Sequence, residues 1–135
     1  MREIDKIIVH CTATPEGRDV SVEYITQWHK AQGFTTIGYH YVVLLDGTVV
    51  HGRGEHRIGA HCFGHNASSI GVVYVGGLTK SGKPKDTRTP AQKKALLSLL
   101  RELRVKYPKA SIHGHNEYSN KACPCFDAHK EYKDL

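Results

Sequence analysis

The sequence has no long hydrophobic run. Its longest apolar stretches, residues 41–45 and 70–75, have the length of a strand and fall far short of the roughly 20 residues that a membrane-crossing helix needs. The first six residues carry alternating charges, run directly into a short apolar segment and lack the apolar core of a secretory signal. We therefore expect no membrane insertion and synthesis in the cytoplasm without a signal peptide, so that export would need another route.

Repeats, low-complexity tracts and internal linkers are also missing from the sequence. With 135 residues, of which 39% are hydrophobic and 24% charged, the composition fits one ordinary globular domain and leaves no room for a second. We predict that residues 1–135 form a single domain, and we expect a monomer.

Acidic residues are fewer than basic ones. Thirteen Asp and Glu oppose 19 Lys and Arg, which gives a formal net charge of +6. Such a charge favours an anionic partner, and both nucleic acid and an anionic cell wall qualify. The positive charges are dispersed, however, with Lys93 and Lys94 the nearest approach to a cluster, and no basic arm typical of nucleic-acid binding is present. We therefore predict a solvated basic surface and no nucleic-acid site.

Cysteine and histidine are the residues that indicate a metal-binding or catalytic site. Four cysteines could form two disulfides, but a chain of this length has enough core not to need them, and we read Cys11 and Cys62 as reduced, packed thiols. The ten histidines are the stronger signal. Histidine is the commonest protein metal ligand and an acid-base group near neutral pH.

Strand-like and helix-like segments alternate along the chain. Buried strands are expected at residues 7–9, 70–75 and 110–115, and a hairpin is expected at residues 39–50, where Asp46-Gly47 is typical of a tight primed turn. Residues 52–69 read as a long surface loop, and the tail after the last strand as irregular.

Two helices complete this pattern. Ser21 is expected to cap a helix of about twelve residues that ends at Gly33. Thr89-Pro90 is a start signal for a second helix, which carries one apolar stripe of leucines at positions 96, 99, 100 and 103. The sequence thus predicts an α/β fold, with a central mixed sheet flanked by helices.

Several residues could supply a catalytic zinc site. His10 is expected at a strand end, His113 or His115 near the end of a later strand, and Cys123 and Cys125 follow in the tail. Two imidazoles and a thiolate leave one tetrahedral position open for water, as catalytic zinc requires. On spacing alone, His10 could equally be a hydrogen-bonded histidine that closes its strand, and the two cysteines could be ordinary buried thiols.

Eight short motifs occur in an order that resembles a known enzyme family. They resemble the type 2 N-acetylmuramoyl-L-alanine amidases, and most of all the small phage lysozyme-type members. The resemblance extends from about His10 to Asp127. The motifs are Val9-His10-Cys11-Thr12-Ala13-Thr14, Trp28-His29-Lys30, Gly38-Tyr39-His40-Tyr41, Asp46-Gly47-Thr48, Ser69-Ile70-Gly71-Val72, Thr89-Pro90-Ala91-Gln92, Gly114-His115-Asn116-Glu117 and Lys121-Ala122-Cys123-Pro124-Cys125-Phe126-Asp127.

This resemblance implies the amidase fold, with Zn²⁺ in an open groove at the sheet edge. It also implies hydrolysis of the amide bond between N-acetylmuramic acid and L-alanine in bacterial peptidoglycan. Carried over residue by residue, it implies that zinc is bound by His10, His115 and Cys123, and so selects His115 over His113. Cys125 departs from the family pattern, which has small polar residues there, and this leaves a possible competition between two thiols for the metal.

The resemblance also assigns four further residues. Tyr39 and Lys121 match the two catalytic positions of the lytic members, although by themselves they read as a packing residue and a solvated charge. His61 and Asn66 match positions that line the peptidoglycan cleft, and their alternative reading is that they satisfy the backbone of their own loop.

Three other functions remain as alternatives. The first is a non-catalytic peptidoglycan-binding module of the same fold, and the second is a thiol hydrolase that pairs Cys123 or Cys11 with a histidine. The third is a basic DNA-binding protein, which the dispersed charge disfavours. The amidase reading implies an endolysin-like enzyme that degrades the cell wall, with the wall or the periplasm as its site of action.

Overall fold

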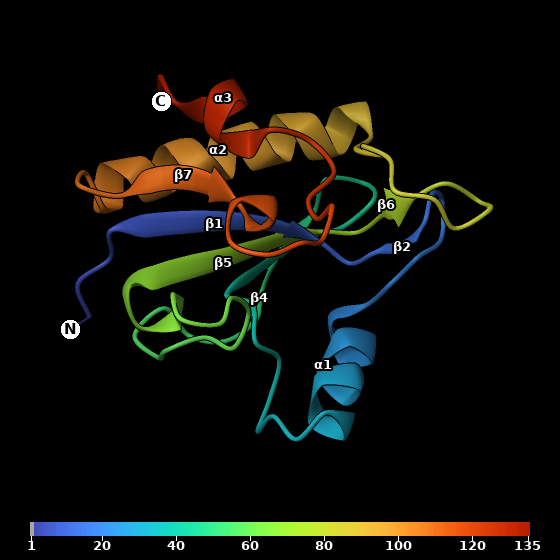
Figure 1. Ribbon diagram of the computed structural model, residues 1–135, viewed down its shortest axis with the longest axis horizontal. Helices are drawn as coiled ribbons and strands as arrows, with labels where there is room; N and C mark the ends of the chain where they lie inside the picture. Colours follow the sequence, from blue (N-terminus) through green and yellow to red (C-terminus); the bar gives the residue numbers. More distant parts are fainter. Residues whose placement is uncertain (1) are drawn as a thin grey trace.

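The computed structural model describes residues 2–135, which form a five-stranded mixed sheet between helical layers (Figure 1). The strand order is β4-β3-β5-β1-β7. Strand β1 pairs in parallel with β5 and with β7, β3 pairs in parallel with β5, and β4 runs antiparallel to β3. A two-stranded sheet joins β2 to β6. The strands are β1 (Lys6–Cys11), β2 (Thr14–Pro15), β3 (Tyr41–Val43), β4 (Val49–His51), β5 (Ser69–Tyr74), β6 (Gly77–Leu78) and β7 (Ser111–Gly114).

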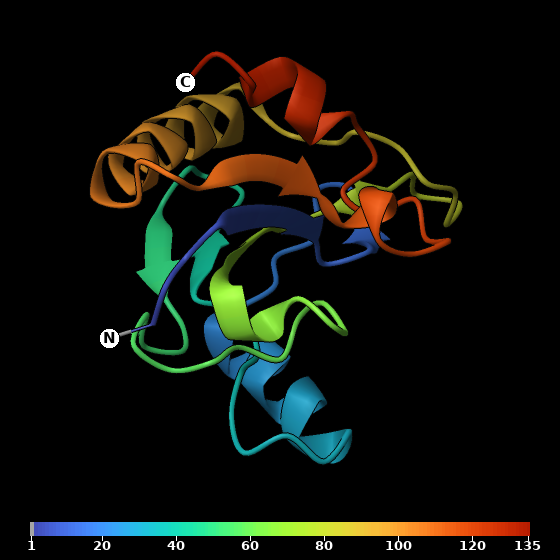
Figure 2. The same ribbon diagram turned by 60° about the vertical axis from the view of Figure 1, so that its left-hand side comes forward.

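The helices lie on opposite sides of this sheet. Figures 1 and 2 show α2 and α3 on one side and α1 on the other. The helical segments are α1 (Val22–Ala31), α2 (Pro90–Lys106), α3 (Ala128–Tyr132) and the 3-10 turns η1 (Asn66–Ser68) and η2 (His115–Glu117). This arrangement confirms the predicted α/β fold. Within residues 2–135, no helix combines the length and the apolarity that a membrane crossing requires.

Strand β1 divides its side chains between the two layers. Ile7 and Val9 belong to the core under α2, where they pack with the buried leucines of that helix. Because successive side chains of a strand point to opposite faces, His10 projects to the side that carries α1. The hydrophobic pattern of the strand therefore determines on which face His10 becomes available.

Helix α2 is fixed on the sheet by its first turn. Thr89 Oγ1 accepts the N–H of Gln92 at 3.0 Å, and Gln92 Oε1 accepts the N–H of Thr89 at 2.9 Å, which is a capping box. The fully buried Gln92 amide also donates to the carbonyl of Val75 at 2.9 Å. Both the start of the helix and its leucine stripe are as predicted.

Two local expectations were wrong. The N–H of Leu44 donates to the carbonyl of Thr48, so the hairpin loop has three residues, 45–47, in place of a two-residue turn. Gly47 takes φ +88°, and its N–H closes a turn on Leu44, which is the common three-residue loop with glycine in the left-handed region. The tail is not wholly irregular, because Asp127 Oδ1 caps α3 by accepting the N–H of Lys130 at 3.0 Å.

Candidate active site

An open groove of about 560 Å³ lies at the carboxyl ends of β1 and β7. This is the end of a parallel sheet at which α/β proteins commonly bind ligands. The groove is lined by α1 and the segment after it, by residues 60–66 and by the loop before α3. The lining residues are His10, Cys11, Thr12, Ala13, Trp28, His29, Gln32, Phe34, Tyr39, Ala60, His61, Cys62, Phe63, Asn66, His115, Lys121 and Cys123.

Three metal-binding side chains meet at the floor of this groove. One donor atom from each of His10, His115 and Cys123 lies within 4.8 Å of the other two. The rings of His10 and His115 are 4.6 Å apart, and His10 Nδ1 is 3.9 Å from Cys123 Sγ. The structure thus brings together the three residues expected to bind metal.

His10 is held in one orientation by a chain of hydrogen bonds. Its Nε2 lies 2.8 Å from His61 Nδ1, and His61 Nε2 lies 3.1 Å from Ser69 Oγ. One of the two assignments that satisfy both contacts has His10 Nε2–H donating to His61, and His61 Nε2–H donating to Ser69. This assignment leaves His10 Nδ1 without a proton on the side that faces Cys123.

Burial keeps the imidazoles of the groove neutral. It lowers the pKa of His10 well below the ordinary value, and nearby His61 and His115 lower it further. Burial is also the main cause that lowers the pKa of His61, to about 3. For His115, burial and then the charge of Lys121 lower the pKa. A neutral imidazole has a lone pair to offer to a cation, so these shifts favour metal binding.

Three of the four cysteines, Cys11, Cys123 and Cys125, differ in their hydrogen bonds and pKa values. Hydrogen bonds from the Cys11 side chain and from its N–H, the latter at 3.1 Å, lower the pKa of Cys123 against the opposing effect of burial. The hydrogen bond to Cys123 and burial raise the pKa of Cys11. Cys125 donates to the carbonyl of Gly77 at 3.2 Å, and burial raises its pKa to about 11. Cys123 is therefore the sulfur best prepared to act as a thiolate ligand.

Tyr39 and Lys121 line the same groove as the three donors. The Tyr39 ring is 5.1 Å from the His10 ring and 5.2 Å from the His29 ring. Burial raises the pKa of Tyr39, and the sulfur atoms of Cys123 and Cys11 raise it further, so its phenol stays protonated. Lys121 is exposed at the rim of the groove.

His61 and Asn66 also line the groove, but their polar side-chain atoms form hydrogen bonds with other groups of the protein. Both ring nitrogens of His61 have protein partners. Asn66 Oδ1 accepts the N–H groups of His61 and Cys62, each at 2.9 Å. In the structure as it stands, these contacts fit the loop-stabilising reading of Asn66 and a supporting role for His61 behind His10.

Several lining residues had no assignment from the sequence. His29 Nδ1 accepts the N–H of Gly38 at 2.8 Å and so positions the backbone just before Tyr39. Trp28 and Phe34 are partly exposed, and Phe63 is 99% exposed. Trp28 belongs to one of the eight motifs but had no assigned role, and Phe34 and Phe63 belong to none of them.

Comparison with known proteins gives a consistent picture. Residues 1–126 match the family described as N-acetylmuramoyl-L-alanine amidase. The chain is 47% identical over 126 residues to the endolysin of Klebsiella phage KP32, a match that covers 93% of this chain and 83% of that protein. It is 48% identical over 123 residues to the endolysin of Escherichia phage T7, covering 91% and 82%. The solved structure of the N-acetylmuramoyl-L-alanine amidase LysC from Clostridium intestinale URNW superposes with a TM-score of 0.81 at 28% identity, covering 96% of this chain and 82% of that one.

Proposed function

The chain belongs to the N-acetylmuramoyl-L-alanine amidase family, and we propose that it hydrolyses the amide bond between N-acetylmuramic acid and L-alanine in bacterial peptidoglycan with the help of zinc. The observation that carries this proposal is the convergence of His10, His115 and Cys123 at the floor of an open groove. A module that only bound the wall would have no need of three converging metal donors.

The donor set fits zinc. Two neutral imidazoles and a thiol of lowered pKa are the nitrogen and sulfur ligands that Zn²⁺ takes in tetrahedral sites, and three protein ligands leave the fourth position open. Zinc bound there would supply a Lewis acid and a water of lowered pKa. Cys125 is not part of the group, since its sulfur points to the carbonyl of Gly77.

Two side chains of the groove act on the substrate in this proposal. The ammonium group of Lys121 stands at the rim, where it can stabilise the negative charge that develops on the substrate carbonyl oxygen. Tyr39 keeps its proton because its pKa is raised. In the metal-free protein Tyr39 is therefore a hydrogen-bond donor. A base role would require the positive charge of bound zinc to lower the pKa of the phenol.

The substrate class also agrees with the charge of the molecule. The formal net charge of +6 favours accumulation at an anionic cell wall. The proposed site of action is accordingly the peptidoglycan layer.

The decisive experiment is mass spectrometry of the peptides released from purified peptidoglycan. The protein is tested as purified, after chelation, and after zinc is restored. We expect stem peptides with a new amino-terminal L-alanine, their loss on chelation, and their return with zinc. Intact peptidoglycan in all three conditions, with the protein folded and zinc bound, would indicate a binding module. Activity that survives chelation but is stopped by thiol alkylation would indicate a thiol hydrolase.

Ligand variants test the site itself. Cys123→Ser and His10→Ala each remove one donor, so both should lose zinc and activity. Cys125→Ser is the matched control, because its hydroxyl can still donate to Gly77 and it lies outside the donor group. Full zinc content and activity in Cys123→Ser would overturn the assignment.

A further inference from the structure

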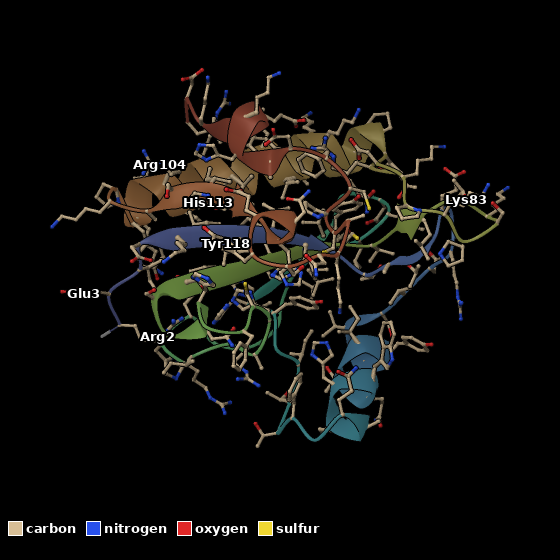
Figure 3. All side chains as sticks on the ribbon, in the orientation of Figure 1. Arg2, Glu3, Lys83, Arg104, His113 and Tyr118 are labelled. Atoms are coloured by element: carbon tan, nitrogen blue, oxygen red, sulfur yellow. The ribbon has the colours of Figure 1, made fainter. Side chains whose placement is uncertain are left out.

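A second group of metal-binding side chains lies outside the groove, at the outer edge of the sheet. His113 comes from β7, Glu117 from η2 and His129 from α3, and one donor atom of each lies within 4.8 Å of the other two. Figure 3 marks His113 on β7. None of these three residues lines the groove. We propose that they form a second metal site, for a divalent transition-metal ion such as Zn²⁺.

The hydrogen bonds around the two histidines favour this use. His129 Nδ1–H donates to the carbonyl of Ile112 at 2.9 Å, which leaves Nε2 of that ring without a proton. The His113 ring has Ser111 Oγ at 2.6 Å from its Nε2 and Glu117 Oε1 at 2.9 Å from its Nδ1. When a metal ion takes the place of the Glu117 contact at Nδ1, the single proton of the neutral His113 ring is on Nε2 and is donated to Ser111. Both rings then have the second nitrogen anchored, as is usual for metal-ligating histidines.

The carboxylate is anchored in the same way. Glu117 Oε2 accepts the N–H of Gly114 at 2.8 Å, so Oε1 is the oxygen that faces the histidines. The rings of His113 and His129 are stacked with 4.9 Å between their centroids and 5° between their planes, so one ring must turn for both in-plane lone pairs to reach a single ion. A capping contact accounts for Glu117, a salt bridge for His113 and the bond to Ile112 for His129 Nδ1. None of these contacts uses His129 Nε2.

The donor types define the class of ion. Two imidazoles and one carboxylate suit zinc, cobalt, nickel or copper, whereas magnesium and calcium prefer oxygen ligands alone. Since His113 and Glu117 flank His115 in the sequence, an ion here ties β7, η2 and α3 together around one of the groove donors. The expected consequence is a more rigid support for His115.

Stoichiometry separates this site from the one in the groove. Zinc is titrated into metal-free protein and counted by native mass spectrometry in the wild type, Cys123→Ser, His129→Asn and the double variant. We expect the wild type to bind two zinc ions, each single variant to bind one, and the double variant to bind none. The Asn side chain can still donate to the Ile112 carbonyl, so His129→Asn removes the free ring nitrogen with little effect on the docking of α3. Glu117→Gln, which keeps an acceptor for Gly114, is a second variant expected to lose one ion.

Cobalt gives an independent measurement, because a thiolate-to-cobalt charge-transfer band can come only from a site that contains cysteine. Cys123→Ser should bind one Co²⁺ with ligand-field absorption and without that band. In this background, Ser111→Ala should weaken cobalt binding by about tenfold, since it removes the anchor of His113. His56→Ala is the control, because it deletes an exposed histidine outside both groups and should leave binding unchanged.

The outcomes discriminate clearly. A Cys123→Ser protein that binds no ion, or a His129→Asn protein that keeps both with unchanged affinity, overturns the second site. If instead the wild type and Cys123→Ser each bind one ion, and His129→Asn binds none, the second site stands and the zinc site in the groove fails.

Discussion

His10 uses its two ring nitrogens for different purposes. Nε2 is engaged by His61, which in turn is engaged by Ser69, and Nδ1 faces Cys123. Rotation of the His10 ring would break the contact with His61, so the hydrogen-bond chain restricts the ring to one useful orientation. His61 therefore acts as a positioning residue for the proposed metal site.

Removing this support should weaken zinc binding. We expect His61→Leu to lower zinc affinity by 10- to 100-fold, roughly the effect of losing an outer-shell partner. His61→Asn offers an oxygen near the position of Nδ1 and should recover most of the affinity. Competition with a chromophoric chelator measures both variants, and equal affinity in the wild type and the Leu variant would remove His61 from this role.

Lys121 should affect the rate and leave metal content unchanged. Loss of its ammonium group in Lys121→Ala should lower kcat by about 10²- to 10³-fold, as the loss of one donor to a developing oxyanion does. Lys121→Arg should recover part of the rate because the charge remains. Lys80→Ala, which removes an exposed lysine outside the groove, serves as control. Unchanged peptide release by Lys121→Ala would exclude Lys121 from the reaction.

Local signals explain which elements the sequence could predict. Helix α2 was predictable because its capping residues lie within four positions and its leucines recur at helical spacing. Strands β1 and β5 were predictable from short apolar runs. Helix α3 has five residues, too few for a periodic pattern, and its position depends on packing of Ala128 and Tyr132 against the core.

Contacts between distant segments explain what the sequence left open. Spacing alone could not choose between His113 and His115, and the choice rested on resemblance to the amidase family. Each of the two belongs to a separate group of three side chains that could hold a metal ion. The hydrogen bond between His10 and His61 joins residues 51 positions apart, and no local sequence pattern predicts such a pair.

The capping box of α2 gives a test at the level of the helix. Thr89→Ala removes the acceptor for the N–H of Gln92 and the donor to the carbonyl of Leu45 at 2.9 Å. We expect the free energy of unfolding to fall by about 1–2 kcal/mol, as for other lost N-caps. Urea denaturation measures the change. Thr35→Ala, at an exposed position before β3, should stay within about 0.5 kcal/mol of the wild type.

The molecule as a whole should be sensitive to mild acid when metal is absent. The pKa values of His10, His29, His40, His61 and His115 are all lowered, with burial as the first cause in each case. Below the ordinary histidine pKa of about 6.5, the unfolded chain binds protons that the folded chain does not. The free energy of unfolding therefore falls as pH falls. For His61 this loss extends down to about pH 3.

Urea midpoints of the chelated protein at several pH values test this expectation. We expect the midpoint to decrease steadily from pH 7 to pH 5, above the range in which most carboxylates titrate. His61→Asn should show a shallower decrease, since one buried imidazole is gone. A midpoint that stays constant between pH 7 and pH 5 would contradict neutral burial of these rings.

The position of β1 in the sheet has a consequence for the order of folding. This strand is one of the first segments of the chain, yet it lies between β5 and β7, whose registers pair Ile7 with Ile70 and with Ile112. During synthesis, β1 cannot complete its pairing until β5 and β7 have been made, and β7 follows β1 by about a hundred residues. Such non-local pairing slows folding. His10 consequently meets His115 and Cys123 only after the chain has been made as far as Cys123, so a shorter nascent chain cannot assemble the three donors.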